Sequence, residues 1–414
     1  MTLHHHKRTN CRLCGSKELE SVLHLKPTPP ANSFVSAAEK DKPQELYPLD
    51  VYRCADCGHL QLLDIVDPKV MFSHYVYVSS TSPVMVGYLR DQCAAIVRRL
   101  NLKQGDLVVE FGSNDGALLR FFKEAGMRVL GVDPAGNVAP DSAEIENIID
   151  FFGAKVGKQI REKYGPAKAI CAYNVCAHID DLRGVIDGVR SLLAPDGQFV
   201  FEVGYLLDVY RKTLFDTIYH EHVDFHHVEP LKRFFADNGL KLLHAERSDI
   251  QGGALVGYVG SSTQHEDNTV AELITEEHKA GLHLADTFHR WSDMINIRGE
   301  ELMLLLRGLK AKGRSIAAYG ATAKATTMMY NFGIDVSILD YIVDDNPLKQ
   351  GMFTPGLHIP VYSANVLYQK KPDYVLLLAW NFAEPIVKKH RLYAGNKSRF
   401  ILPLPNLTII GGES

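Results

Sequence analysis

Short apolar runs alternate with amphipathic stretches through the middle of the chain. The strand-like runs cover 106–112, 128–134, 168–175 and 198–204, with amphipathic stretches at 117–126 and 181–197 between them. Strands that alternate with helices of about 10–15 residues form parallel, doubly wound sheets. We therefore predict an α/β domain here, preceded by a helix over 84–101.

The same alternation returns near the C-terminus. After a helix and two strands in 231–260 and a long polar helical stretch, strand and helix patterns alternate again over 314–404. This predicts a second, nucleotide-binding-like α/β sheet. The expected domains are an N-terminal module (1–70), a central domain (71–262), a helical connector (263–312) and a C-terminal domain (313–414).

Two CxxC-Gly motifs occur in the loop-rich N-terminal region. Cys11 and Cys14 form the first pair, and Cys54 and Cys57 form the second. Each CxxC turn can present two thiolates to one ion, and the following glycine lets the backbone fold beneath it. Four thiolates leave no open coordination position, so we predict a structural zinc site. The alternative is four unrelated thiols.

Composition and charge narrow the function classes. The formal net charge is -4 without a basic cluster, which argues against nucleic acid as a partner. No apolar run approaches the roughly 20 residues that span a bilayer, and the N-terminal letters MTLHHHKRTN do not resemble a secretory signal. Seven cysteines argue against a disulfide framework, and Cys93, Cys171 and Cys176 are interpreted as core residues. We expect a cytoplasmic protein with no membrane partner. Its oligomeric state is open, with a monomer as the working expectation.

The segment LVVEFGSNDGALLRFF predicts a strand, a glycine-containing turn and a helix. Gly112 and Gly116 bracket the turn, where side chains would block a ligand. A dinucleotide fold needs G-x-G-x-x-G, with its central glycine beneath a pyrophosphate. Asn114 occupies that position here, and the carboxylate of Asp115 would repel a pyrophosphate.

Acidic residues instead suit S-adenosyl-L-methionine, which carries an ammonium group, a sulfonium and ribose hydroxyls. Glu110 ends the first strand, Asp115 lies in the turn, and Asp133 ends the next strand, where a ribose would be held. The alternative for each carboxylate is an ordinary cap or turn residue. The expected cofactor-binding residues are Glu110, Gly112, Asn114, Asp115, Gly116, Asp133 and Asn174.

The double CxxC module, the EFGSNDG loop and the long motifs FDTIYHEH and YGATAKATT together resemble the sugar C-methyltransferases of deoxysugar biosynthesis. The resemblance covers essentially the whole chain. It implies a zinc-binding module, a central Rossmann-like methyltransferase domain and a C-terminal Rossmann-like α/β domain that binds the sugar nucleotide. It also implies S-adenosyl-L-methionine and Zn²⁺ as cofactors, and a dTDP-linked 4-keto-sugar as substrate.

The resemblance carries catalytic residues onto this sequence. Tyr219, Glu221 and His222 match the catalytic segment, and His178 matches a histidine on the substrate side of the cofactor. Tyr75 and Tyr77 match an aromatic pair over the methyl donor, and which of the two faces it is open.

Chemistry gives the YHEH segment a role of its own. Methylating carbon requires removal of a proton beside a carbonyl, for which histidine is suited near neutral pH. We assign His222 as the base, Tyr219 as donor to the enolate and Glu221 as a hydroxyl ligand or orienter. An extended segment would pair Tyr219 with Glu221, whereas a turn would bring Tyr219 to His222. The rivals are an exposed polar loop and a metal site formed by His220, Glu221, His222, His226 and His227.

A second anion-binding pattern lies in the C-terminal domain. Tyr319, Gly320 and Lys324 follow a predicted strand and open a helix, where free N–H groups and a lysine suit a pyrophosphate. The alternative is an ordinary turn with a solvated lysine. Trp380 and Asn381 end a later strand on the edge where open sheets bind ligands, although Trp380 could equally be a core residue.

These features predict an S-adenosyl-L-methionine-dependent C-methyltransferase. We expect it to deprotonate a carbon next to the 4-keto group of a nucleotide-linked deoxysugar and to methylate it at C-3'. The alternatives are an NAD(P)-dependent sugar-nucleotide oxidoreductase or epimerase, and a zinc-stabilised scaffold. The choice between C-3' and C-5', the nucleotide base and the presence of an amino group are open.

Overall fold

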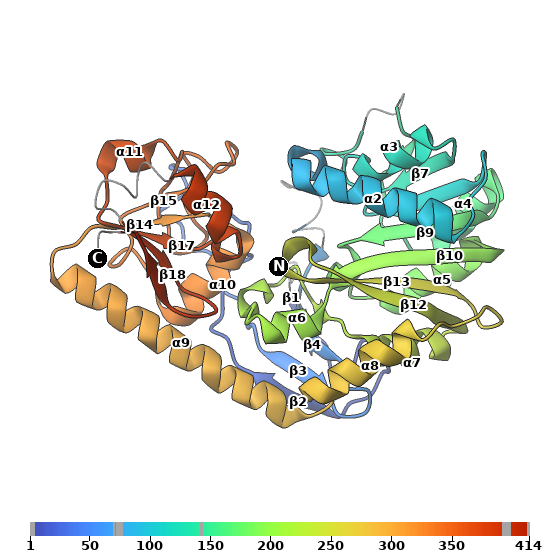
Figure 1. Ribbon diagram of the computed structural model, residues 1–414, viewed down its shortest axis with the longest axis horizontal. Helices are drawn as coiled ribbons and strands as arrows, with labels where there is room; N and C mark the ends of the chain where they lie inside the picture. Colours follow the sequence, from blue (N-terminus) through green and yellow to red (C-terminus); the bar gives the residue numbers. More distant parts are fainter. Residues whose placement is uncertain (1–4, 69–70, 72–77, 141–143, 391–398, 412–414) are drawn as a thin grey trace. The chain divides into compact units, whose positions relative to one another are not determined.

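The computed structural model describes residues 5–68, 71, 78–140, 144–390 and 399–411 (Figure 1). The chain divides into two compact units. Unit 1 comprises 1–20, 52–208 and 223–284, and unit 2 comprises 21–51, 209–222 and 285–414. The helix–strand alternation of the sequence therefore builds two separate cores. Within the described ranges, no helix combines the length and apolar character needed to cross a membrane.

A seven-stranded sheet forms the centre of unit 1, in the order β12-β13-β10-β9-β6-β7-β8. In chain order its strands are β6 Leu107–Phe111, β7 Arg128–Val132, β8 Asn147–Ile148, β9 Ala167–Tyr173, β10 Leu193–Gly204, β12 Leu240–Ser248 and β13 Ala254–Ser261. Strands β6 to β10 run parallel, while β13 pairs antiparallel with β10 and β12. The parallel strands form the predicted doubly wound arrangement, and the antiparallel strands β13 and β12 lie at one edge of it.

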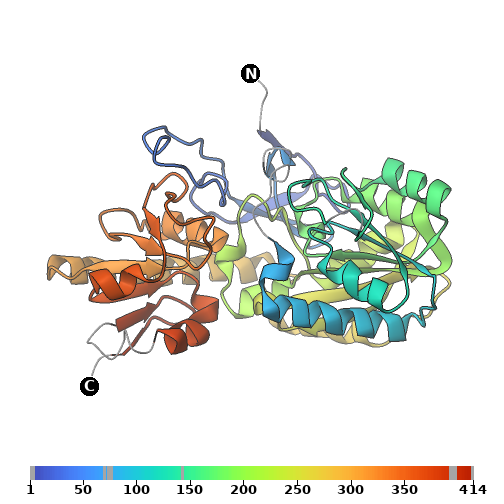
Figure 2. The ribbon, with the colours of Figure 1, turned by 90° about the horizontal axis from the view of Figure 1, so that it is seen from above.

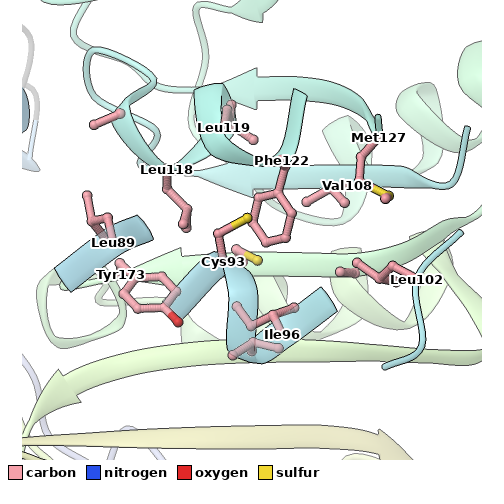
Figure 3. Packing of buried hydrophobic residues seen from close by; sticks show 14 of the residues in the cluster. Leu89, Cys93, Ile96, Leu102, Val108, Leu118, Leu119, Phe122, Met127 and Tyr173 are labelled. Atoms are coloured by element: carbon pink, nitrogen blue, oxygen red, sulfur yellow. The ribbon is translucent and has the colours of Figure 1, made fainter. Parts of the chain in front are cut away.

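Helices cover both faces of this sheet (Figure 2). They are α2 Pro83–Arg99, α3 Ala117–Glu124, α4 Ala154–Tyr164, α5 Leu182–Leu192, α7 Val228–Asp237 and α8 Thr269–Ala280, with α6 Leu206–Arg211 after β10. Side chains of α2 and α3, among them Cys93 and Phe122, pack with Val108 and Tyr173 of the sheet (Figure 3). Cys93, Cys171 and Cys176 are all buried, as predicted for core residues.

The N-terminal module consists of short strands. A pair is formed by β1 His5–Lys7 and β5 Asp64–Val66, and a four-stranded sheet has the order β11-β4-β3-β2. The strands of that sheet are β2 Leu19–Leu23, β3 Val51–Cys54, β4 Leu60–Leu62 and β11 Asp224–Phe225.

Short 3-10 turns occur at η1 Ser79–Thr81, η2 Cys176–His178, η3 Phe215–Thr217, η4 Ile250–Gly252 and η5 Trp380–Phe382.

Unit 2 contains the second α/β sheet, in the order β16-β15-β14-β17-β18-β19. Its strands are β14 Ile316–Tyr319, β15 Ile342–Val343, β16 Val361–Tyr362, β17 Tyr374–Leu377, β18 Arg399–Leu402 and β19 Thr408–Ile410. Its helices are the long α9 Ala285–Ala311, α10 Ala323–Phe332, α11 Val366–Lys370 and α12 Ala383–Lys389 (Figure 1). Unit 2 also includes 209–222, which contains the YHEH motif.

Candidate functional site

The two CxxC-Gly motifs, 11–15 and 54–58, are called knuckles below. Their four cysteines converge in unit 1. The Sγ atoms of Cys11 and Cys57 are 3.6 Å apart and those of Cys14 and Cys54 are 3.5 Å apart, and all four lie within 4.8 Å of one another. Zinc–sulfur bonds of about 2.3 Å in a tetrahedron place sulfurs about 3.8 Å apart. The residues therefore fit a closed Zn²⁺ site.

The backbone of each knuckle is built for this convergence. Gly15 and Gly58 both adopt φ +80°, and each donates its N–H to the first cysteine of its own pair. Burial raises the pKa of Cys14 to about 11, because a buried thiolate without a counter-ion is unfavourable. A bound cation supplies that counter-charge, which is why such modules depend on their metal.

The glycine turn after β6 is tightly packed. Gly112 adopts φ +66°, and a Cβ there would lie 2.1 Å from Val175 Cγ2. Gly116 adopts φ +75°, and its Cβ would lie 2.9 Å from Ile145 Cδ1. Both glycines are therefore required by backbone conformation and by neighbouring side chains.

Asp133 holds the same turn from the end of β7. Its two carboxylate oxygens each accept one backbone N–H, from Asn114 and Ala135, at 2.8 Å. The Asn114 side chain in turn accepts the N–H of Ser79 at 3.0 Å. The carboxylate thus fixes the loop that was predicted to hold the cofactor.

Acidic side chains surround this loop. Glu110 is buried at the end of β6, and within the described part of the chain neither Glu110 Oε2 nor Asp115 Oδ1 has a hydrogen-bond partner. Burial raises the pKa of Glu110 well above its usual range, and the carboxylates of Asp133 and Asp115 raise it further. Arg120 approaches Asp115 at 3.8 Å. Buried carboxylate oxygens without a hydrogen-bond partner, such as Glu110 Oε2 and Asp115 Oδ1, fit the cationic amino-acid end of S-adenosyl-L-methionine.

A second polar cluster lies at the ends of β9 and β10. Asn174 adopts φ +56° and donates to Glu202 Oε1 at 2.7 Å, while the Tyr88 hydroxyl donates to Glu202 Oε2. Burial raises the pKa of Glu202 to about 7. Sequence reasoning named Asn174 but missed Glu202 and Tyr88. The signal for Glu202 was its place at the carboxyl end of a predicted parallel strand.

The other predicted residues of unit 1 are only partly described. His178 ends the turn η2 and is half-buried. Tyr75 and Tyr77 lie outside the described residues.

In unit 2, Tyr219 and His222 form a hydrogen-bonded pair. A backbone bond from His222 N–H to Tyr219 O, at 2.8 Å, closes a turn, and the Tyr219 hydroxyl lies 3.1 Å from His222 Nε2. His222 Nδ1 lies 2.7 Å from the carbonyl of Thr217, which can only accept a hydrogen bond. Nδ1 therefore carries the proton, and Nε2 presents its lone pair toward the phenol.

Charged groups flank this pair. Burial lowers the pKa of His222 to about 4, and the nearby Lys324 ammonium lowers it as well. Asp216 is fully buried, accepts a hydrogen bond from Trp380 Nε1 at 2.7 Å, and interacts with Lys324. Burial also lowers the pKa of Lys324. His222 is thus a neutral imidazole beside a lysine.

Glu221 points into a different polar group of unit 2. It is buried and accepts a hydrogen bond from the Asn32 side chain at 2.7 Å. Burial raises the pKa of Glu221 to about 7, while the Asn32 bond and the Lys349 charge act to lower it. Sequence reasoning missed Asn32 and Lys349, because no local pattern links them to the YHEH motif. It also gave no role to Asp216, although the motif FDTIYHEH contains it.

The two rivals for the YHEH region find no support. His220 and Glu221 are buried, so the exposed-loop interpretation is wrong. Among the described residues, the four cysteines form the one group of metal-ligating side chains with converging atoms. His226 and His227 are buried in unit 1, and burial lowers the pKa of His226 to about 4.

The loop after β14 has some of its donors satisfied internally. Asp344 accepts the N–H of Ala321 at 2.7 Å, and Tyr319 donates its hydroxyl to Asp345 at 2.8 Å. Gly320 adopts φ +98°, where a Cβ would lie 2.5 Å from the Ala379 side chain. Lys324 is half-buried rather than solvated. Trp380 is buried and Asn381 half-buried, both in η5 beyond β17.

Comparisons with known proteins identify the family. Three family models match in succession: a zinc binding domain over 11–72, a methyltransferase domain over 85–245 and a C-methyltransferase C-terminal domain over 249–405. The C-methyltransferase NovU of Streptomyces niveus is 36% identical over 408 residues, which are 98% of this chain and 97% of that protein. The chain belongs to the C-methyltransferase family.

Solved structures of other methyltransferases match part of the length of this C-methyltransferase. An S-adenosyl-L-methionine-dependent methyltransferase of Anabaena variabilis ATCC 29413 is 16% identical, with a TM-score of 0.33, and the match covers 41% of this chain and 83% of that one. A magnesium protoporphyrin IX methyltransferase of Synechocystis PCC 6803, bound to SAH, is 15% identical with a TM-score of 0.33, over 43% and 83% of the two chains.

Family membership decides between the functions left open by the sequence. The protein is an S-adenosyl-L-methionine-dependent C-methyltransferase with a zinc-binding module, as predicted. The oxidoreductase and scaffold alternatives are set aside. Adenosylmethionine supplies an electrophilic methyl group when bound.

Proposed function

We propose that this C-methyltransferase acts on a nucleotide-linked 4-keto-deoxysugar, with dTDP as the nucleotide, and methylates C-3'. The observation that carries the proposal is the Tyr219–His222 pair. Its imidazole is neutral, has a defined tautomer and is hydrogen-bonded to a phenol. Carbon methylation needs a base for an acidic C–H and a donor for the enolate that results, and this pair provides both.

The proposed proton transfer follows from the tautomer. His222 Nε2 takes the proton from the sugar carbon, while the electron pair of the C–H bond moves into an enolate whose oxygen is the former keto oxygen. Thr217 accepts the Nδ1–H bond and so stabilises the imidazolium that forms. The Tyr219 hydroxyl, which donates to His222 Nε2, turns its hydrogen to the enolate oxygen and so frees the Nε2 lone pair for the sugar proton, while the Lys324 charge favours the developing anion.

Cationic groups of unit 2 support an anionic, sugar-nucleotide substrate. Lys324 and Lys349 are both half-buried, and burial lowers the pKa of each. A diphosphate would add negative charge to that of Asp216 near Lys324 and of Asp344 and Glu221 near Lys349, and so favour the charged form of both lysines. We propose that Tyr319, Gly320 and Asn381 line the same region, and that Glu221, held by Asn32, accepts a hydrogen bond from a sugar hydroxyl.

Unit 1 is proposed to bind the methyl donor. The predicted cofactor residues follow the carboxyl ends of its parallel strands, where open α/β sheets bind ligands. Ile149 and Phe151 are exposed by 54% and 43% just after β8 and offer apolar surface to an adenine ring. His178 remains a proposed residue on the substrate side of the donor, and Tyr75 and Tyr77 remain a proposed aromatic pair over it. The domain limits 1–70, 71–262, 263–312 and 313–414 also remain a proposal.

Proton exchange tests this function directly. The enzyme is incubated in D₂O with a dTDP-4-keto-deoxysugar, without the methyl donor and with S-adenosylhomocysteine, and exchange at C-3' is followed by NMR. Exchange that needs His222 is expected, together with a new carbon-bound methyl group once the donor is added. Methylation at oxygen or nitrogen would refute the enolate mechanism, because neither atom needs a carbanion. Exchange and methylation at C-5' would refute the C-3' assignment alone.

A further inference from the structure

Arg12 is an arginine with no solvent exposure inside the first zinc knuckle. It lies between Cys11 and Cys14, and its side chain is 0% exposed. A fully buried guanidinium is costly unless all its N–H groups have acceptors. The groups that accept its hydrogen bonds therefore indicate the role of the Arg12 side chain.

The guanidinium of Arg12 bonds to segments far away in the sequence. Nη1 donates to Asp224 Oδ1 and to the carbonyl of Val223, both at 3.0 Å. Nε donates to Asp180 Oδ1 at 3.2 Å, and Nη2 donates to the carbonyl of Leu62 at 3.1 Å. Gln61 provides a further acceptor at 3.4 Å. The planar fork thus joins one knuckle to two other loops of unit 1.

Those two loops adjoin the proposed catalytic histidines. Val223 directly follows His222 in the chain, and Asp180 lies two residues after His178. The loops are also tied to each other, because Val223 N–H donates to the carbonyl of Ala177 at 2.8 Å. Arg12 therefore holds the carbonyl of Val223, directly after the YHEH segment, and the side chain of Asp180 in the loop after β9.

We propose that Arg12 is a positioning residue for methyl transfer. The cysteines on either side of it, once bound to Zn²⁺, fix its backbone, and its guanidinium then holds Asp180, in the loop that carries His178, and Val223, the residue that directly follows His222 in the chain. The inference rests on the proposed roles of those histidines. It gives the zinc module a part in catalysis besides stabilising its own fold.

Two other arginines provide matched comparisons. Arg8 also donates to Asp180 Oδ1, at 2.8 Å, but its side chain is 19% exposed. Arg183 donates to the carbonyl of Leu13 at 2.9 Å, so it contacts the same knuckle without reaching Val223 or Asp224. Loss of Arg183 removes a knuckle contact and leaves the Arg12 fork intact.

The test compares Arg12→Lys and Arg12→Gln with Arg183→Gln in the full-length, zinc-loaded enzyme. Zinc per chain, S-adenosyl-L-methionine affinity, kcat, KM and local hydrogen exchange are measured for each. We expect both Arg12 variants to retain zinc and donor affinity. We expect kcat to fall by roughly 10- to 100-fold, less for lysine than for glutamine, with KM little changed. Amide exchange should accelerate in peptides covering 176–181 and 222–225, and Arg183→Gln should match the wild type.

Asp180→Asn serves as a milder variant should Arg12→Gln fold poorly. It keeps an oxygen acceptor and should accelerate exchange only in 176–181, with a smaller fall in kcat. Wild-type kcat and wild-type local exchange in zinc-loaded Arg12→Lys and Arg12→Gln would overturn the inference. So would a uniform rise in exchange over all of unit 1, which marks a purely structural role. Failure of the proposed function appears separately, as an unchanged kcat in His222→Ala.

Discussion

Nε2 of His222 lies 3.1 Å from the hydroxyl of Tyr219, three residues earlier in the chain. The sequence left two arrangements open for this segment, an extended strand and a turn. The backbone bond from His222 to Tyr219 selects the turn, because it brings residues i and i+3 together. The phenol and the imidazole are therefore close enough to act on one substrate, the phenol on the keto oxygen and the imidazole on the C–H of the adjacent carbon.

Substituting His222 should abolish the base while preserving donor binding. In His222→Ala we expect kcat to fall by roughly 10²–10⁴-fold, the usual contribution of a general base, because no other group takes the proton. S-adenosyl-L-methionine affinity, measured by isothermal titration, should be unchanged. The exposed His265 offers a matched control, and His265→Ala should retain wild-type kcat.

Tyr219→Phe removes one oxygen and keeps the ring. We expect a lower kcat, because the enolate loses a preorganised donor, while His222-dependent proton exchange in D₂O persists. Exchange that survives in His222→Ala but disappears in Tyr219→Phe would reverse the two roles. Steady-state kinetics and NMR exchange on the same preparations separate these outcomes.

The pH profile should reveal the lowered pKa of His222. The base works only when neutral, so kcat/KM should fall as the pH drops through about 4 rather than through the ordinary value of about 6.5. Lys324→Met removes a positive charge that lowers this pKa, so the acid limb should move to higher pH. Lys312→Met, at an exposed position, should leave the limb in place. A limb that does not respond to Lys324 would assign it to another group, such as Glu221.

Removal of zinc should unfold the N-terminal module. The wild type should contain about one zinc per chain, and Cys54→Ser should lower thermal stability, because three thiolates cannot close the tetrahedron. Metal analysis and thermal denaturation with and without a chelator test this. Cys93→Ser provides a control, because it alters a buried thiol outside the cluster and should leave the zinc content unchanged. A metal-free preparation as stable as the wild type would contradict the structural role.

Most of the fold could be predicted from local sequence patterns. The alternation of strands and helices, and the spacing of the CxxC pairs, depend on residues close in sequence, and both appear in the structure as predicted. Local patterns could not predict which segments of the chain pack together in unit 2. Asn32 reaches Glu221 across 189 positions, and Trp380 reaches Asp216 across 164. Such pairs leave no periodic signal in the sequence, so the residues that surround the YHEH motif can be identified only from the structure.

The glycine turn shows a second limit. The sequence analysis explained Gly112 and Gly116 by the close approach of a ligand to the backbone. In the structure, a Cβ atom added to Gly112 would collide with the Val175 side chain, and one added to Gly116 would collide with that of Ile145. Both explanations demand glycine, and sequence alone does not separate them. The same holds for Asp133, whose oxygens accept backbone bonds that no motif announces.

Asp133 and Asp344 make the same pair of contacts in the two sheets, which permits a matched test. Asp133 accepts N–H bonds from Asn114 and Ala135, and Asp344 accepts them from Ala321 and from the second residue after itself, Asn346. Asp133→Ala should weaken S-adenosyl-L-methionine binding by about 1–3 kcal/mol, because two loop N–H groups lose their acceptor and the loop loses its shape. Asp344→Ala should leave that affinity unchanged and weaken binding of the sugar nucleotide instead.

Isothermal titration of both variants with both ligands gives four affinities, and thermal denaturation confirms that each variant is folded. Equal losses of donor affinity in the two variants would mean that the titration reports general destabilisation. Wild-type donor affinity in Asp133→Ala would move the cofactor site away from the β6–β7 edge. Selective loss of donor affinity in Asp133→Ala, with selective loss of sugar-nucleotide affinity in Asp344→Ala, would assign one ligand to each sheet, because each carboxylate shapes only the loop that it bonds.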